Sequence, residues 1–266
     1  MTAPDHVSSD AFYQHAMQVL QEAKIDFLVG GAYALRHYTG IIRDTKDFDI
    51  FLRPKDIEPA LNVFQKSGYR GGVAFPHWLA KVHHGENFID LVYRAGNGLC
   101  EVDDAWFSPV EEGTLLDMPV RLCPPDVMIW QKAYIMERER FDGGDIAHLL
   151  RSSAERIDWP LLLERFGPDW RVLFSHLMLF GFIYPGERHR LPPDVMRDLL
   201  GRMAAELESP GTSEKLCQGT YLSRGQYLPD IERWGYRDVR TSDRCYMDED
   251  DVRTWTNAIS QAEPTR

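Results

Sequence analysis

Two aspartates lie two positions apart in the segment DFDIFL, whose other residues are all bulky and apolar. Successive side chains of a β-strand point to opposite faces, so Asp47 and Asp49 share one face while Phe48 and Ile50 occupy the other. Two neighbouring carboxylates on a sheet repel each other unless a cation lies between them. Their oxygens suit Mg²⁺, which often also binds substrate phosphates. The pair predicts a divalent-metal site; the alternative is an exposed strand face after a turn that starts at Asp44.

A pair of glycines and a third acid add to this pattern. Gly30 and Gly31 follow the apolar run FLV and precede AYALRHY, which can start a helix. Glycine lets the backbone approach a ligand closely, and a helix start offers free N–H groups to phosphate. A Gly-Gly pair alone is more often a plain turn. Asp90, among apolar residues in NFIDLVY, could complete a two-metal site or take a proton from an attacking hydroxyl.

The order of these motifs resembles the nucleotidyltransferase superfamily typified by DNA polymerase beta. The motifs are an apolar run with Gly-Gly, then Arg43-x-Thr45-x-Asp47-x-Asp49, then an aspartate on a later strand. The likeness is greatest to the small bacterial members, which include abortive-infection toxins and antibiotic-modifying transferases, and it covers about Asp10 to Leu150. It implies an α+β fold, with a small mixed, mostly antiparallel sheet and flanking helices, followed by a mainly helical C-terminal region.

The resemblance also implies roles for residues of this chain. The metal ligands, which would also carry catalysis, are Asp47, Asp49 and Asp90. The nucleotide-binding residues would be Gly30, Gly31, Arg43, Thr45 and Lys132. Lys132 would neutralise phosphate charge, and a solvated helix lysine is an equal alternative. The chain departs from many members of the superfamily, which have serine at the position of Gly31, and its interval from Gly31 to Asp47 is slightly longer than usual.

The reaction implied by the resemblance is nucleotidyl transfer. With Mg²⁺, or Mn²⁺, bound, an acceptor hydroxyl would attack the alpha phosphorus of a nucleoside triphosphate such as ATP, and pyrophosphate would leave. The acceptor would be a small hydroxylated molecule, a protein or a tRNA. A noncatalytic nucleotide-binding or antitoxin-like partner that kept the fold is the alternative. Three acids on a packed face argue against that alternative, because without a metal they carry a stability cost.

The charge balance bears on the acceptor. Thirty basic and 41 acidic residues give a net charge of −11, which disfavours nonspecific binding to nucleic acid or to anionic membranes. A C-terminal set of basic and aromatic residues could stack bases or a sugar, although such residues more often form packing and a solvated rim. Its members are Arg224, Arg233, Arg237, Arg240, Arg244, Tyr221, Tyr227, Trp234 and Tyr236.

The helices and strands that position the acids are predicted from the spacing of apolar residues along the sequence. Apolar spacing predicts a first helix over Phe12 to Ala23 and another after Asp56, a plausible cap, with Gly68 as its stop. The runs HWLAKVHH and NFIDLVYR, joined by Gly85-Glu86, predict an antiparallel hairpin, and VRLC predicts a further strand. A helix is expected from Pro125 to about Arg140. We expect a nucleotidyltransferase domain over residues 1–152 and a mainly helical domain over 153–266.

Other sequence features indicate local structure or cellular location rather than a catalytic role. His83 and His84 are adjacent and should face opposite ways on a strand, and His176 should lie in a helical core. The run DEDD before VRTWTNAI predicts a helix cap. Four scattered cysteines favour a reducing compartment, and the start of the chain has no secretory pattern, so a cytoplasmic location is expected. The most apolar segment is shorter than the roughly 20 residues that cross a bilayer.

Overall fold

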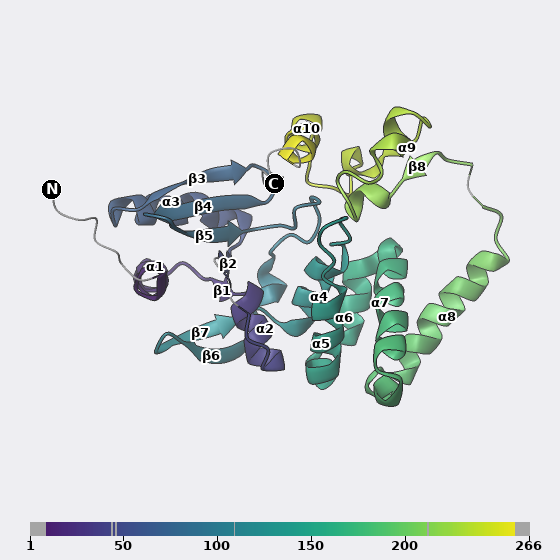
Figure 1. The fold of residues 1–266 in the computed structure, drawn as a ribbon, viewed down its shortest axis with the longest axis horizontal. Helices are drawn as coiled ribbons and strands as arrows, with labels where there is room; N and C mark the ends of the chain where they lie inside the picture. Colours follow the sequence, from purple (N-terminus) through teal and green to yellow (C-terminus); the bar gives the residue numbers. More distant parts are fainter. Residues whose placement is uncertain (1–8, 44, 46, 109, 212, 259–266) are drawn as a thin grey trace. The chain divides into compact units, whose positions relative to one another are not determined.

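The computed structural model describes residues 9–43, 45, 47–108, 110–211 and 213–258. The chain forms two compact units, Met1–Pro124 and Pro125–Arg266 (Figure 1). The first unit holds the sheet with the two aspartates of DFDIFL, and the second is mainly helical. Each unit is described by itself below.

The first unit is built on a seven-stranded sheet with the order β3-β4-β5-β2-β1-β7-β6. Its strands are β1 (Leu28–Val29), β2 (Asp47–Phe51), β3 (Arg70–Phe75), β4 (Leu79–His84), β5 (Asn87–Val92), β6 (Glu111–Leu115) and β7 (Met118–Leu122). Neighbours are antiparallel except for the parallel pairs β2–β5 and β1–β7. This mostly antiparallel sheet with flanking helices confirms the α+β fold class.

The helices of the first unit are α1 (Ser9–Glu22), α2 (Gly31–Thr39) and α3 (Ile57–Lys66), with short 3-10 turns at Pro54–Asp56 and Asp104–Phe107. The buried face of α1 packs on the sheet, where the ring of Tyr13 stacks on Phe48 at 4.6 Å between centroids. Phe48 and Ile50 are fully buried, whereas Asp47 is exposed. The alternation in DFDIFL therefore places Phe48 and Ile50 in the core and both acids on the other face, which they share with Phe51.

Two strands of this seven-stranded sheet were not predicted from the sequence. β3 has the sequence RGGVAF and β6 has EEGTL, and neither shows the bulky apolar alternation typical of a strand. β3 is an edge strand that pairs with β4, and β6 is an edge strand that pairs with β7. Edge strands bury less than central ones, so their sequences carry a weaker signal. Asp56 precedes α3 as expected, but its side chain makes no cap hydrogen bond.

The second unit is a set of helices followed by short mixed elements. Its α-helices are α4 (Pro125–Ala133), α5 (Gly143–Ser153), α6 (Trp159–Phe166), α7 (Trp170–Ile183), α8 (Pro193–Leu207), α9 (Leu228–Glu232) and α10 (Glu249–Asn257). The parallel strands β8 (Leu216–Cys217) and β9 (Arg237–Asp238) form a small second sheet. Helices α4 to α7 pack on one another (Figure 1). No helix in the described part of the chain is long and apolar enough to cross a membrane.

The division between the units lies earlier than the boundary that we predicted after residue 152. Helices α4 and α5 pack on each other and on α7, and α4 also packs on α6, so they belong to the second unit. Their apolar faces, which include the fully buried Ile129 and Leu149, are visible in the sequence. The sequence does not show which partner a face covers, which explains the different boundary.

The helix that we predicted from Pro125 to about Arg140 ends at Ala133. Beyond it, the Met136 N–H donates to the carbonyl of Leu222 at 3.1 Å, and Met136 pairs with Phe141 in an isolated β-bridge. These backbone contacts replace the helical ones, so tertiary packing overrides the local preference. His176 is buried in α7, where its Nε2 lies 2.9 Å from the carbonyl oxygen of Ala133, which confirms its place in a helical core.

Candidate active site

The three acids predicted as metal ligands lie on one face of the first unit's sheet. β2 and β5 are parallel neighbours in which Asp49 is in register with Asp90, and Asp47 is in register with Phe88. Residues in register on adjacent strands point to the same face, as do residues two apart on one strand. The structure therefore brings Asp90 beside Asp49, with Asp47 one step along the same face. We call these three side chains the acid row.

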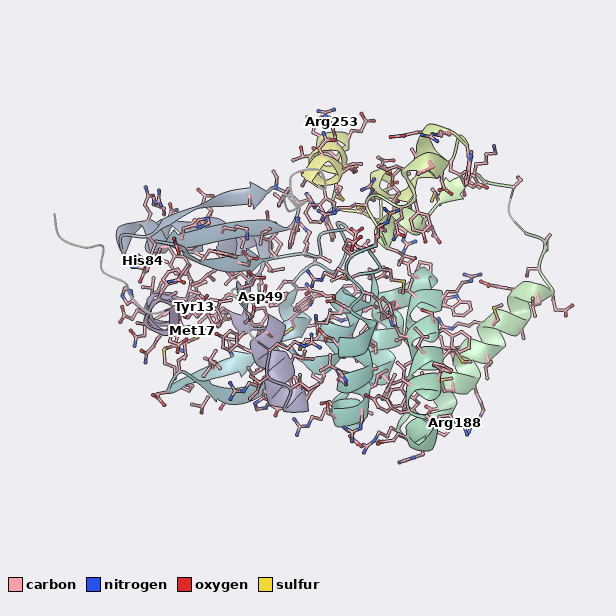
Figure 2. All side chains as sticks on the ribbon, viewed as in Figure 1. Tyr13, Met17, Asp49, His84, Arg188 and Arg253 are labelled. Carbon is pink, nitrogen blue, oxygen red and sulfur yellow. The ribbon has the colours of Figure 1, made fainter. Side chains whose placement is uncertain are left out.

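The glycine turn lies directly against the acid row. Gly31 has a φ of +53°, and a Cβ on it would lie 1.8 Å from Oδ2 of Asp49. A Cβ on Gly30 would lie 2.0 Å from the ring of Phe51, on the same face of the sheet. The Gly30 N–H donates to the carbonyl of Asp49 at 3.0 Å. Figure 2 shows Asp49 beside the start of α2. A Cβ at either glycine would therefore displace a neighbouring side chain, and at Gly31 it would also strain the backbone.

Helix α2 starts at this turn. Its N-cap is Gly30, which has no side chain to cap the first N–H groups. The first turn of α2 contains no acidic residue. A helix start presents N–H donors and the positive end of the helix dipole, and both favour an anion such as phosphate. The turn therefore places an anion-binding group next to the carboxylate of Asp49.

Lys81 of β4 is a site residue that sequence analysis missed. It is in register with Asp90, and its Nζ lies 2.6 Å from Oδ1 of that acid. The side chains of Lys81 and Asp90 are 29% and 14% exposed. The two-residue turn Gly85-Glu86 fixes this register, since equal counts back and forward from the turn pair Lys81 with Asp90. The predicted hairpin therefore already implied that Lys81 lies beside Asp90.

The environment of Asp90 acts on its ionisation in two directions. Burial raises the pKa of Asp90 above its ordinary value, because the charged form loses hydration, and the negative charge of Asp47 adds to the rise. The hydrogen bond and positive charge of Lys81 act in the opposite direction, as does His83 more weakly. The net pKa of Asp90 is raised. Asp90 is therefore suited to take up a proton more readily than an ordinary aspartate.

Basic residues occupy the neighbouring strands of the same face. His83 of β4 is in register with Arg70 of β3, and Lys81 is in register with Gly72. His84 turns to the other face, where its ring lies 5.5 Å from Phe12 between centroids. The predicted opposite orientations of the two histidines are thus confirmed. Along the sheet, acids occupy β2 and β5, and cations occupy β3 and β4.

Arg43 and Thr45 precede the acid row. The Asp47 N–H donates to Oγ1 of Thr45 at 3.1 Å, and Thr45 Oγ1 donates in turn to the carbonyl of Asp47. Thr45 therefore fixes the start of β2. Arg43 is exposed. Asp44 and Lys46 lie outside the described residues, so the turn that we considered as an alternative has no structural description.

Lys132, predicted to bind nucleotide, belongs to an ion-pair cluster in the second unit. Its Nζ lies 2.7 Å from Asp142 and 2.8 Å from Asp145, and Arg140 also pairs with Asp142 at 2.9 Å. Both acids are buried. Burial acts to raise the pKa of Asp142, but the hydrogen bond from Arg140 and the charge of Lys132 hold it below its ordinary value. Lys132 therefore holds α4 to the start of α5.

The C-terminal arginines that could stack bases mostly make ion pairs within the second unit. Arg240 is almost fully buried and pairs with Asp238 at 2.7 Å, and Arg244 pairs with Asp169 at 2.7 Å. The other pairs are Arg224 with Glu137 and Arg237 with Glu214. Tyr221 is buried as well. These contacts are the packing and rim that we gave as the commoner interpretation. The capping box of Asp248 and Asp251 on α10 confirms the predicted helix cap.

The acid row has the donor chemistry that a hard divalent cation requires. Carboxylates on adjacent strands offer oxygen ligands on one face, beside a turn suited to phosphate, and this set fits Mg²⁺ or Mn²⁺. Within the described residues, no three His, Cys, Asp or Glu side chains are already grouped to hold a metal ion. Asp90 is turned to Lys81 at 2.6 Å. Metal binding by all three acids therefore requires that Asp90 change its partner.

A cleft of about 540 Å³ lies elsewhere in the first unit. Its lining comes from the end of α1, the segment before β1, and strands β6 and β7, and it includes Asp26 and Arg121. These two residues form an ion pair at 2.7 Å. The predicted site residues do not line this cleft. The chemistry of the acid row, rather than cavity size, identifies the candidate site.

No protein-family model matches the sequence, and no curated protein matches it. Solved structures with a similar fold include a lincosamide antibiotic adenylyltransferase, LnuA, bound to lincomycin (15% identity, TM-score 0.38, 54% of this chain and 96% of that one). Another is ANT(2″)-Ia in complex with adenylyl-2″-tobramycin (13% identity, TM-score 0.40, 67% of this chain and 99% of that one). A third is an antigenic nucleotidyltransferase-like protein from Paracoccidioides brasiliensis (15% identity, TM-score 0.36, 63% of this chain and 91% of that one).

The identities of 13 to 15% and the TM-scores below 0.5 are too low to transfer a substrate or an activity. The chemistry of this chain must therefore be argued from the acid row, the glycine turn and Lys81.

Proposed function

We propose that the chain is a nucleotidyltransferase that moves a nucleoside monophosphate from a triphosphate to an acceptor hydroxyl and releases pyrophosphate. One observation carries the proposal. Asp49 is in register with Asp90 on parallel strands, and its carboxylate lies against the glycine turn that starts α2. Metal-binding oxygens and a phosphate-binding helix start thus occur side by side, which is the combination that phosphoryl transfer requires.

In this proposal, each group of site residues has its own role in the reaction. The glycine turn and the start of α2 bind the phosphates of the triphosphate. Asp47, Asp49 and Asp90 would hold Mg²⁺ or Mn²⁺, which when bound would supply positive charge against the charge developing at phosphorus. Asp90, whose pKa is raised by burial, accepts the proton of the acceptor hydroxyl. Catalysis in this arrangement is mostly positioning and charge neutralisation.

The residues around the acid row have supporting roles. Thr45 bonds to the backbone of Asp47 and keeps β2 in position, and Arg43 lies beside this lead-in to the strand. Lys132 is left out of the binding site in this proposal, because Asp142 and Asp145 already hold its ammonium.

For the acceptor, we favour a small hydroxylated molecule or a protein over tRNA. The net charge of −11 opposes RNA binding, and Arg224, Arg237, Arg240 and Arg244 are occupied by ion pairs within the second unit. A phosphate backbone would have to compete with those carboxylates. The nucleoside triphosphate is proposed to be ATP or a related nucleotide.

The test is pyrophosphate release by the full chain, with each triphosphate and a panel of hydroxylated small molecules, protein and tRNA as acceptors. Asp49→Asn should lower the rate by at least about 10³-fold, because it removes a metal ligand and its charge. Asp250→Asn is the matched control, since this acid is 78% exposed and pairs only with the nearby Arg253 among its described contacts. Mass spectrometry of the acceptor should show an added nucleoside monophosphate.

The opposite result has a defined meaning. If Asp49→Asn released pyrophosphate at the wild-type rate, the metal role of the acid row would be lost. If the wild type were stabilised by ATP with Mg²⁺ but released no pyrophosphate with any acceptor, the noncatalytic nucleotide-binding or antitoxin-like alternative would be favoured. Nucleotide at about 100 times its dissociation constant would stabilise either version by about 2.7 kcal/mol, so binding alone does not decide.

A further inference from the structure

The ion pair between Lys81 and Asp90 lies within the proposed site and still lacks a role there. Nζ of Lys81 lies 2.6 Å from Oδ1 of Asp90, and the acid side chain is only 14% exposed. The two residues occupy the same register position on antiparallel neighbours, so the backbone of the hairpin places them together. The contact is therefore built into the hairpin rather than formed by two free surface side chains.

A second contact holds Lys81 over the same face. Its ammonium lies 4.2 Å from the ring centroid of Phe88, the residue in register with Asp47. A cation above an aromatic face is attracted to the ring, more strongly where water is partly excluded. Lys81 thus has one anionic and one aromatic partner on β5, and both direct its charge towards the acid row.

A divalent cation and Lys81 compete for one carboxylate. For Asp90 to join Asp47 and Asp49 around a metal ion, its oxygens must turn towards β2 and away from the ammonium at 2.6 Å. A metal ion close to the ammonium would also repel it, because like charges at short distance in a partly buried site are unfavourable. Both effects oppose simultaneous binding.

We propose that Lys81 is an exchangeable counterion of Asp90. It neutralises this acid until a divalent cation binds, and it is displaced when Asp90 turns to the metal. Lys81 is therefore a positioning residue that sets the metal concentration at which the third acid engages. The inference rests on the proposed function in one respect, which is that Asp90 is a metal ligand.

The structure leaves space for the Lys81 ammonium when it is displaced from Asp90. The Lys81 side chain is 29% exposed, so it reaches water without crossing the core. Gly72, its register partner on the edge strand β3, has open space where a Cβ would stand. The exchange therefore needs rotation of two side chains and no movement of the strands.

The experiment measures Mn²⁺ binding to the full chain by calorimetry, with Mn²⁺ as the probe and no acceptor present. Lys81→Met should bind Mn²⁺ on the order of tenfold more tightly than the wild type, because it removes the competing cation. Lys81→Arg keeps the charge and should bind within about twofold of the wild type. Lys66→Met, on the exposed end of α3, is the control for loss of a positive charge elsewhere in the same unit.

A second pair of variants separates competition from misfolding. Asp90→Asn removes the shared carboxylate, so adding Lys81→Met to it should change Mn²⁺ affinity by less than about twofold. Circular dichroism and the unfolding midpoint check that each variant is folded. The double variant leaves no unpaired charge in the pair, so it keeps the test usable if Lys81→Met alone is unstable.

Equal or weaker Mn²⁺ binding by folded Lys81→Met would overturn the inference, as would the absence of Mn²⁺ binding by the wild type. Weaker binding would show that Lys81 orients Asp90 as a ligand instead of competing for it. The proposed function is decided separately by pyrophosphate release. A wild type that releases pyrophosphate, with a Lys81→Met variant of unchanged Mn²⁺ affinity, would contradict the counterion role alone.

Discussion

Each unit of the molecule combines a lysine with aspartates, but the two arrangements differ. In the second unit, Lys132 bridges two buried acids and Arg140 adds a second cation, so positive and negative groups alternate in one cluster. In the first unit, the acids lie together on β2 and β5 and the basic residues lie on the neighbouring strands. Lys81 pairs with one acid of the acid row, so the row keeps an excess of negative charge that a bound cation can neutralise, whereas the alternating charges around Lys132 neutralise one another.

The difference teaches how to distinguish structural acids from functional ones. Asp142 and Asp145 are buried and hold helices together, and their partners lie within 3 Å. Asp47 is exposed and lies at the first position of its strand, where structure alone does not demand a charge. An acid that the fold does not need, placed beside others like it, is a stronger functional candidate than a buried and paired one.

The largest effect on stability should come from the second unit. Asp142→Asn removes the shared partner of Lys132 and Arg140, and should lower the free energy of unfolding of that unit by about 3 kcal/mol, as expected for a broken buried pair. Asp47→Asn, its counterpart in the acid row, should change stability by less than about 0.5 kcal/mol. Hydrogen exchange of peptides from α5 and β2 would measure both. Similar costs for the two variants would remove the distinction between the clusters.

The glycine turn gives the next largest effect. Gly31→Ala should destabilise the first unit by about 2 kcal/mol, because a φ of +53° is strained for alanine and its Cβ would displace the carboxylate of Asp49. Gly40→Ala has a similar φ of +72° but open space around its Cβ, so it should cost only about 1 kcal/mol. Urea unfolding measures the difference.

Pyrophosphate release distinguishes the two glycine variants further. The Gly31 variant should be at least about tenfold slower than the Gly40 variant, because a displaced Asp49 no longer meets the metal in the right position. Equal rates for the two would show that the close approach of Asp49 to the turn has no catalytic importance.

The smallest effect is a pH dependence of opposite sign in the two units. The pKa of Asp142 lies below its ordinary value of 3.8, so its stabilising contribution is present above that pH and is lost as the pH falls towards the folded-state pKa. The pKa of Asp90 lies above 3.8, so its ionisation opposes folding and stability falls as the pH rises from 3.8 through the raised pKa.

Urea unfolding between about pH 3 and about pH 6, followed with a probe in each unit, would show the two slopes. Asp142→Asn should flatten the loss of stability on the acid side for the second unit, and Asp90→Asn should flatten the fall in stability above pH 3.8 for the first. The same sign of slope in both wild-type units would contradict the different environments that we assign to these acids.

The sequence predicted the acid-bearing strand and the hairpin well, since both depend on short-range patterns. Alternation in DFDIFL places Asp47 and Asp49 on one face whatever the neighbouring strand is. That Asp90 lies in register with Asp49 depends on the pairing of strands distant in sequence, so the sequence indicated only that Asp90 could join the site and not this register. Lys81 was missed because we assigned the hairpin without counting its register from Gly85-Glu86.

Other structural features could not be predicted from the sequence, because they depend on contacts between distant segments. The edge strands β3 and β6 are rich in glycine and charge, and they form because a neighbouring strand offers hydrogen bonds. The end of α4 at Ala133 depends on a backbone bond to Leu222, which is far away in the sequence. The sequence left Lys132 as either a phosphate-binding lysine or a solvated helix lysine, and only the fold shows Asp142 and Asp145 around its ammonium.

The central strand β1 has only two residues, Leu28 and Val29, and both are fully inaccessible to solvent. It joins β2 on one side and β7 on the other, where Val29 is in register with Leu122 and accepts a hydrogen bond from the Cys123 N–H at 2.9 Å. The pairing that joins the two sides of the sheet is therefore only two residues long, and it ends immediately before Gly30. We therefore expect a shift of the β6–β7 ribbon to reach the proposed phosphate-binding turn at Gly30 through its pairing with Val29.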